Sequence, residues 1–140
     1  MTISINTPVE MDFSAGKMSE EQFLAFCADN CELRIEQDQD QNVIVIPPVY
    51  GESGYFENKT SSRVERYEES YGGVSFGANT GFKLPNGATR VPDACWVSNE
   101  RWSTLTPEDK KKFLPVVPDF IIEIRSETDR LKTLQEKMRE

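Results

Sequence analysis

The stretch DFIIEIRS, residues 119–126, has the alternating pattern of a buried β-strand. In this pattern Ile121, Glu123 and Arg125 share one face of the strand. An ionised carboxylate among isoleucines is costly to bury unless a cation or a hydrogen-bond donor pairs with it. Glu123 is therefore either a functional acid or half of a structural ion pair with Arg125.

A second acid lies in the other strand-like run of this half of the chain. RVPD, residues 90–93, leads into an apolar run that ends near Val97. Carboxylates on neighbouring strands are a common way to hold Mg²⁺, so Asp93 and Glu123 are candidate ligands. The backbone carbonyl of Ile124 could supply a further oxygen. In the simpler alternative, Asp93 follows Pro92 into a turn.

Length and cysteine content indicate one domain in a reducing compartment. The 140 residues suffice for one hydrophobic core. Three cysteines argue against a disulfide framework. No apolar run is long enough to cross a membrane, and no secretory signal is visible, so a cytoplasmic protein is expected.

The absence of histidine restricts the chemistry. Histidine-based triads and HExxH zinc sites are excluded, so catalysis would use carboxylates, Lys, Arg, Tyr, Ser or Cys. The net charge of −8 does not attract nucleic acid through the overall field. A nucleic-acid enzyme would therefore need a metal ion or a local basic patch.

The order of helix and strand patterns indicates an α/β or α+β domain with a mixed sheet. Residues 1–17 show no clear periodicity and are expected to form a loose arm. The expected helices begin at Ser19, span 51–70, begin at Thr106 and follow Thr128 or Asp129; the expected strands are 33–36, 43–46, 74–78, 81–84, 91–98 and 119–125.

The last helix carries a candidate lysine. Leu131, Leu134 and Met138 predict its core face, and Lys137 lies at the edge of that face by the 3.6-residue period. Lys137 could orient a water or stabilise developing negative charge. Alternatively it is a solvated lysine. The pattern still reads as helix at Glu140, so a missing C-terminal part is expected.

These motifs, in this order, resemble a large bacterial family described as putative restriction endonucleases, a branch of the PD-(D/E)xK nuclease-like superfamily. The resemblance covers about residues 18–140. It rests on MSEEQF (18–23), LRIE (33–36), IVIPP (44–48), TGFKLPNG (80–87), RVPD (90–93), PDFIIEIRS (118–126) and LQEKM (134–138).

The resemblance implies a restriction-endonuclease-like fold, with a mixed β-sheet flanked by helices, and a site for Mg²⁺ or Mn²⁺. Asp93 matches the first acid of the family and Glu123 the second. Arg125 stands where the superfamily usually has lysine, and Lys137 matches a lysine that such members carry on the following helix. Arg125 could instead hold a phosphate.

The implied function is metal-dependent hydrolysis of DNA phosphodiester bonds. A homodimer is expected, because two symmetric sites cut both strands most simply. The alternative is a non-catalytic binding or oligomerisation module that retains the fold, favoured by the acidic charge and by Arg125. A third, weaker possibility is an unrelated hydrolase that uses the same acids on another substrate.

Other features favour ordinary structural roles. Glu36 could add a metal ligand, but a surface acid is the expected reading. Cys27 and Cys31 would need further ligands to bind zinc, so idle thiols are expected. The lysines at 110–112 follow two acids and predict a solvated helix face, with a phosphate contact as the alternative.

Overall fold

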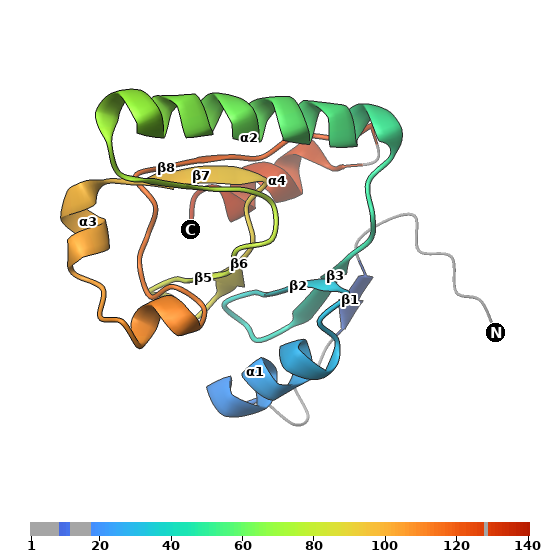
Figure 1. Cartoon of the computed structure of the whole chain (residues 1–140). Coiled ribbons are helices and arrows are strands. Elements are labelled where there is room, and N and C mark those ends of the chain that lie inside the picture. Colours follow the sequence, from blue (N-terminus) through green and yellow to red (C-terminus); the bar gives the residue numbers. More distant parts are fainter. Residues whose placement is uncertain (1–8, 12–17, 128) are drawn as a thin grey trace.

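The computed structural model describes residues 9–11, 18–127 and 129–140, which form two stacked layers (Figure 1). Each layer contains one antiparallel sheet and one long helix. The elements are β1 (Val9–Met11), α1 (Glu20–Asp29), β2 (Arg34–Gln37), β3 (Val43–Ile46), α2 (Gly51–Tyr71), β4 (Val74–Phe76), β5 (Phe82–Lys83), β6 (Thr89–Arg90), β7 (Ala94–Val97), α3 (Asn99–Ser103), the 3₁₀ helix η2 (Asp109–Lys111), β8 (Phe120–Ile122) and α4 (Leu131–Lys137).

The first layer is a five-stranded sheet, β1-β3-β2-β6-β5, with α1 beside it (Figure 1). The Ser19 side chain accepts from the Gln22 N–H and the Gln22 side chain accepts from the Ser19 N–H, so a capping box begins α1 as predicted. Phe23 of this helix packs with Ile35 and Val43 of the β2–β3 hairpin. The opposite face of β2, which carries Arg34 and Glu36, points toward the second layer.

The second layer is a three-stranded sheet, β4-β7-β8, covered by α2 (Figure 1). The Tyr67 ring of α2 lies edge-on to Trp96 of β7 and Phe120 of β8, with centroids 5.2 and 5.5 Å apart. The Trp96 indole donates to the carbonyl of Gly72, the residue that ends α2. These aromatic contacts bind the helix to one face of the sheet.

The opposite face of this sheet points into the protein. Ile121 packs there against a core that includes Phe82, Cys95 and Val97, each with no exposed surface. Because side chains alternate along a strand, Glu123 faces the same way as Ile121. The polar ends of the strands therefore meet between the layers.

The mixture of helices and strands confirms an α+β fold, with one change in topology. The strands form two antiparallel sheets in the described residues, whereas one mixed sheet was expected. The strand at 43–46 and the helix at 51–70 are confirmed to within one residue, and the other predicted strands are present with shorter or shifted bounds. The helix predicted from Thr106 is only the 3₁₀ helix η2, and α3 was not predicted. Strand β1 falls within the predicted arm, whose other residues lie outside the described ones.

The prediction for the last helix was wrong in two respects. Its N-cap is Arg130, because the Asp129 carboxylate instead accepts from the Ser126 N–H; Thr128 lies outside the described residues. Leu131 and Met138 do not face the core, since each is 47% exposed. The helix turns Lys137 inward instead, with only 16% of its side chain exposed.

None of the helices in the described part of the chain is both long and apolar enough to cross a bilayer.

The turn after α2 requires glycine for two separable reasons. Gly73 has φ of +83°, and a Cβ atom there would lie 2.5 Å from the Trp96 indole nitrogen and from the Val97 carbonyl oxygen. Gly73→Ala should cost more than about 2 kcal/mol in urea unfolding, from backbone strain plus the clash. Gly87→Ala is the control, because φ is +92° with nothing within 4 Å. Its cost should be about 1 kcal/mol. Equal losses would contradict the packing account.

Candidate functional site

The register of β7 and β8 brings the two predicted acids together. Ala94 pairs with Ile122 in this antiparallel ladder. Continuing the register by one residue places Asp93 opposite Glu123, and opposed side chains of an antiparallel pair lie about 5 Å apart at Cβ. Residues thirty positions apart in the sequence therefore share one end of the sheet, facing the first layer.

Both carboxylate oxygens of Asp93 are held by the protein. The residue is 6% exposed. Its Oδ2 accepts from the Ile124 N–H at 2.6 Å, and its Oδ1 accepts from the Arg34 guanidinium at 2.9 Å. The same guanidinium nitrogen donates to the Val91 carbonyl. Asp93 is thus fixed in position by the segment that follows β8 in its own layer and by β2 of the other layer.

Glu123 is a buried acid whose partner is Lys137. Its side chain is 6% exposed, and its Oε1 lies 2.8 Å from the Lys137 Nζ. Burial raises the pKa of Glu123, and the Asp93 and Glu36 carboxylates raise it further, while Lys137 opposes the rise. Negative charge at this point is therefore incompletely balanced.

Lys137 lies between two carboxylates. Its Nζ is 2.8 Å from the Glu36 Oε1 and 2.8 Å from the Glu123 Oε1. Burial alone would lower the pKa of Lys137, but the two carboxylates outweigh it and hold that pKa above its ordinary value. The side chain is accordingly an ammonium ion at neutral pH and acts as a hydrogen-bond donor.

Glu36 belongs to this cluster, so its interpretation as a surface acid is wrong. It is 2% exposed and accepts from the Val91 N–H at 2.8 Å as well as from Lys137. Its Oε2 lies 3.3 Å from Arg90, which also contacts Glu140 at 2.6 Å. The available signal was that Glu36 shares a strand face with Arg34, opposite the buried Ile35.

Arg125 is not part of the cluster. The residue is exposed, and its Nε donates to the Asp129 carbonyl at 3.4 Å. The chain leaves the strand after Ile122, so the alternation that placed Arg125 beside Glu123 no longer applies there. The cation that pairs with Glu123 comes from α4 instead.

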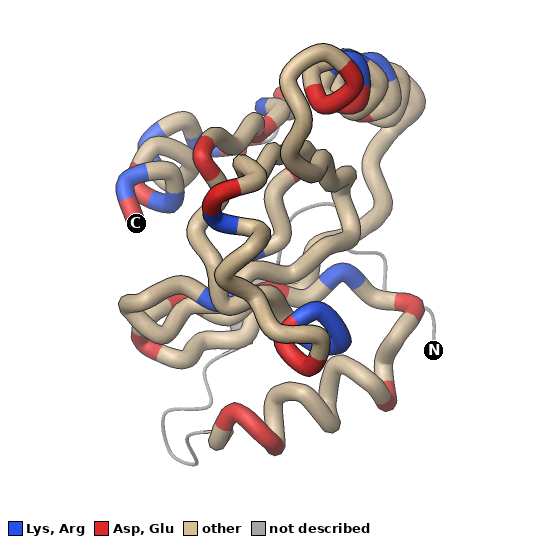
Figure 2. The backbone as a smooth tube through the Cα atoms, turned by 60° about the vertical axis from the view of Figure 1, so that its left-hand side comes forward, with Lys and Arg blue, Asp and Glu red and all other residues tan. Residues whose placement is uncertain are grey.

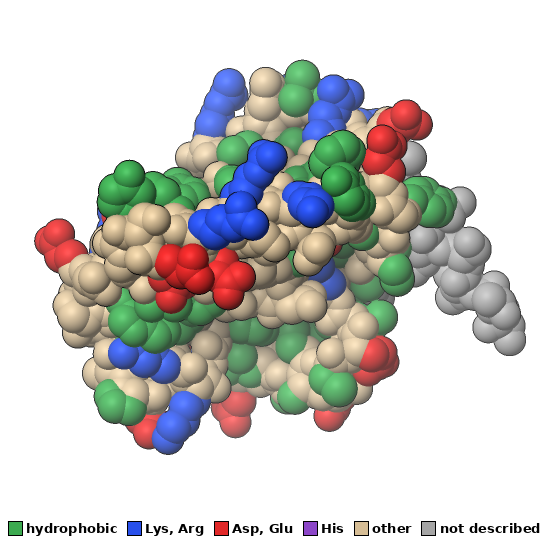
Figure 3. Space-filling model, turned by 45° about the horizontal axis from the view of Figure 1, so that its top comes forward, with side chains coloured by type: hydrophobic (Ala, Val, Ile, Leu, Met, Phe, Trp, Pro, Cys, Tyr) green, Lys and Arg blue, Asp and Glu red, His purple; other side chains and the backbone are tan. Residues whose placement is uncertain are grey.

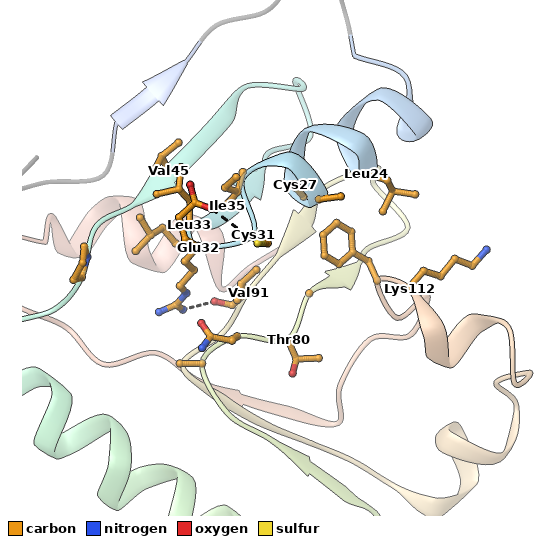
Figure 4. Close-up of a pocket in the computed structure, with 18 of the residues that line it drawn as sticks. Leu24, Cys27, Cys31, Glu32, Leu33, Ile35, Val45, Thr80, Val91 and Lys112 are labelled. Carbon is orange, nitrogen blue, oxygen red and sulfur yellow. Dashed lines mark hydrogen bonds between the residues drawn. The ribbon is translucent and has the colours of Figure 1, made fainter. Parts of the chain in front are cut away.

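A cleft of about 1110 Å³ lies beside the cluster and is lined by Arg34, whereas Asp93, Glu123 and Lys137 do not line it. Figure 4 shows residues of α1 and β2 along one wall, with Val91 and Thr80 across from them. Arg34 and Glu57 also line it, and Arg34 is the residue that contacts Asp93. Burial raises the pKa of Glu57, as does the nearby Asp93, whereas Arg34 lowers it.

The lysines at 110–112 also line the cleft, opposite α1 (Figure 2). Lys110 lies 4.3 Å from the centre of the Trp102 ring, and Lys111 pairs with Glu108 at 2.9 Å. This turn therefore combines basic and acidic side chains. The face that includes α2 also carries both signs of charge beside hydrophobic groups (Figure 3).

The acids outnumber the bases where the two layers meet. Among the described residues the carboxylates that take part in ion pairs here are Glu36, Glu57, Asp93, Glu123 and Glu140, and the cations are Arg34, Arg90 and Lys137. Excess negative charge and hard oxygen donors suit a divalent cation such as Mg²⁺, which needs few protein ligands. No group of three or more His, Cys, Asp or Glu among the described residues has the arrangement of a metal site.

The thiols have ordinary roles in the described structure. Burial raises the pKa of Cys27 to about 11, and burial with the nearby Glu123 charge raises that of Cys95 to about 12. Protonated thiols are poor nucleophiles and poor metal ligands. Cys31 lies beyond the end of α1 and is exposed.

The chain belongs to a family of nuclease-like proteins. The family Uma2, described as putative restriction endonuclease, matches residues 20–140, which is most of the chain and includes all the acids and bases of the cluster. No curated protein matches the chain significantly. The match therefore establishes membership of the putative restriction endonuclease family.

Removing the central cation should unfold the protein more readily. Lys137→Met leaves Glu36 and Glu123 without their shared partner, so the free energy of unfolding should fall by about 3 kcal/mol in urea denaturation at pH 8. Lys132→Met is the matched control on the same helix, since its side chain is 88% exposed and 3.9 Å from Glu136. The control should change stability by less than about 0.5 kcal/mol.

The loss in Lys137→Met should shrink at pH 5. Without the lysine the pKa of Glu123 rises beyond its already raised value, so acid protonates the carboxyl in the folded state and relieves the penalty. The contribution of Lys137 itself is constant over this range, because its raised pKa lies far above it. A loss that is equal at pH 5 and pH 8 would contradict the assignment.

Proposed function

We propose that the protein is a Mg²⁺-dependent DNA endonuclease that hydrolyses phosphodiester bonds. The observation that carries the proposal is the convergence of Asp93, Glu123 and Lys137 at one point between the layers, from three separate segments. Membership of the restriction endonuclease family supports the reaction class.

The order of elements around the site supports a restriction-endonuclease-like fold. Helix α2 precedes the antiparallel strands β4, β7 and β8, and α4 follows them. Asp93 immediately precedes β7, and Glu123 immediately follows β8. Lys137 lies at the end of α4, the helix that follows β8. This order of acid, acid and lysine agrees with the one that the family resemblance implies, and it supports the proposal.

Asp93, Glu123 and the Ile124 carbonyl are the proposed metal ligands. A bound Mg²⁺ or Mn²⁺ would neutralise charge on the phosphate and supply an activated water. The Ile124 N–H and Arg34 hold Asp93 in place from opposite sides. Two carboxylates suffice, because Mg²⁺ retains several waters.

Lys137 acts as a donor in this proposal. Its raised pKa excludes a role as general base at neutral pH, so its ammonium would stabilise developing charge on the phosphate or orient the attacking water. The cleft that Arg34 lines offers an approach for the DNA backbone. Arg125, exposed beside the site, could contact a flanking phosphate.

We also propose that the active form is a homodimer, because one buried site can cut only one strand at a time and a two-fold pair would cut both. A single site would nick a duplex.

The test is cleavage of supercoiled, nicked and single-stranded DNA with Mg²⁺ or Mn²⁺. Asp93→Asn and Glu123→Gln should each lower the rate by at least about 100-fold. Asp119→Asn is the matched control, because Asp119 also adjoins a strand of this sheet but pairs with Arg101 and the Ser98 N–H instead. Its rate should stay within about threefold of the wild type.

Two results would contradict the proposal. One is the absence of metal-dependent cleavage of any of these substrates by the wild type. The other is an equal loss of rate in Asp93→Asn and Asp119→Asn.

A non-catalytic binding or oligomerisation module is the second candidate. Its supporting observation is that both oxygens of Asp93 already accept hydrogen bonds within the protein, and that Lys137 already forms an ion pair with Glu123. A cluster satisfied in this way can serve structure alone. In that case Asp93→Asn would change the melting temperature or the assembly state, and no DNA would be cleaved.

A further inference from the structure

We infer that Glu36 is a positioning residue for the reaction: it fixes the Lys137 ammonium beside Glu123 from the opposite layer of the protein. The inference rests on the proposed function. It assigns a role to the N-terminal hairpin, which supplies none of the acid, acid and lysine set.

Helix α4 does not hold Lys137 by packing. No residue of α4 is buried, its N-cap Arg130 makes no side-chain cap, and Leu131 and Met138 are half exposed. The lysine side chain has a flexible four-carbon stem and an ammonium group with three equivalent N–H donors. It therefore has no fixed orientation unless its hydrogen-bond partners impose one. Its position must therefore come from the carboxylates that it contacts.

Glu36 is the better fixed of those two carboxylates. It lies on β2, in the middle of its sheet, and is 2% exposed. Its Oε1 accepts from the Val91 N–H at 2.8 Å, and this backbone donor has no side-chain torsion that could move it. Glu123, in contrast, lies past the end of β8.

The donors on Glu36 leave it little capacity to bind a metal. Its Oε1 accepts from both Val91 and Lys137, which uses both lone pairs, and its Oε2 faces Arg90 at 3.3 Å. Glu36 therefore acts through Lys137 and does not replace Asp93 or Glu123 as a ligand. It also ties the hairpin layer to the layer that contains the acids.

A double-mutant cycle separates positioning from a merely structural role. Steady-state DNA cleavage over a range of DNA concentrations is measured for the full chain as wild type, Glu36→Gln, Lys137→Met and the double variant, which gives the maximal rate and KM of each. Glu36→Gln should lower the rate at least about tenfold, with KM for DNA within about threefold, because only the reacting geometry is disturbed. In the Lys137→Met background the same change should lower the residual rate less than about threefold.

The control cycle pairs Glu36→Gln with Lys83→Met. Lys83 lies in β5, the edge strand of the same sheet, and forms its ion pair with Glu20, which contacts none of the cluster residues in the described ion pairs. The two changes should act independently there, so that the rate of the double variant is the product of the single effects. Glu36→Asp is the second variant, for use if a thermal melt shows that Glu36→Gln does not fold. It keeps the negative charge but has a shorter side chain, so it should also lower the cleavage rate.

Each outcome decides the inference. Equal effects of Glu36→Gln with and without Lys137, or a Glu36→Asp variant of wild-type rate, would overturn it while the proposed function stands. A wild type that cleaves no DNA would overturn both. A loss confined to the chain that carries Lys137 would establish the positioning role.

Discussion

The structure depends on one electrostatic constraint, which is the burial of Glu123 beside Asp93 between two layers. Two carboxylates in a dry site repel each other and lose hydration, so cations must enter from elsewhere. Arg34 and Lys137 supply them from the first layer and from α4. The cluster therefore ties α4, which has no buried residue of its own, to both layers.

The same constraint explains how the layers are joined. An apolar core binds α1 to one sheet, aromatic contacts bind α2 to the other, and Phe82 and Ile121 pack between the layers. Polar contacts complete the junction: Glu36 and Arg34 of β2 reach the acids of the second layer. A site built across two layers is sensitive to their relative position, which is a common property of active sites that need a fixed geometry.

Much of the fold could be predicted from local patterns, because each of these features depends on neighbouring residues. The capping box at Ser19, the hairpin, the long helix and the acid-bearing strand ends are examples. The burial of Glu36 could not be predicted, because its strand alternates polar and apolar residues in the pattern of a sheet with one solvent-exposed face. Arg125 was misplaced because the strand ends at Ile122, before the predicted alternation reaches it. The inward face of α4 was misplaced because the helix turns Lys137, and not its leucines, toward the acids of the cluster.

The central claim is that Asp93 and Glu123 bind a divalent cation, and calorimetric titration with Mn²⁺ tests it most directly. The account predicts stoichiometric binding by the wild type, its loss in Glu123→Ala, and its retention in Glu32→Ala, where the acid is exposed at the start of the hairpin. Equal binding heats in the wild type and Glu123→Ala would contradict the account, because the cation would then lie elsewhere.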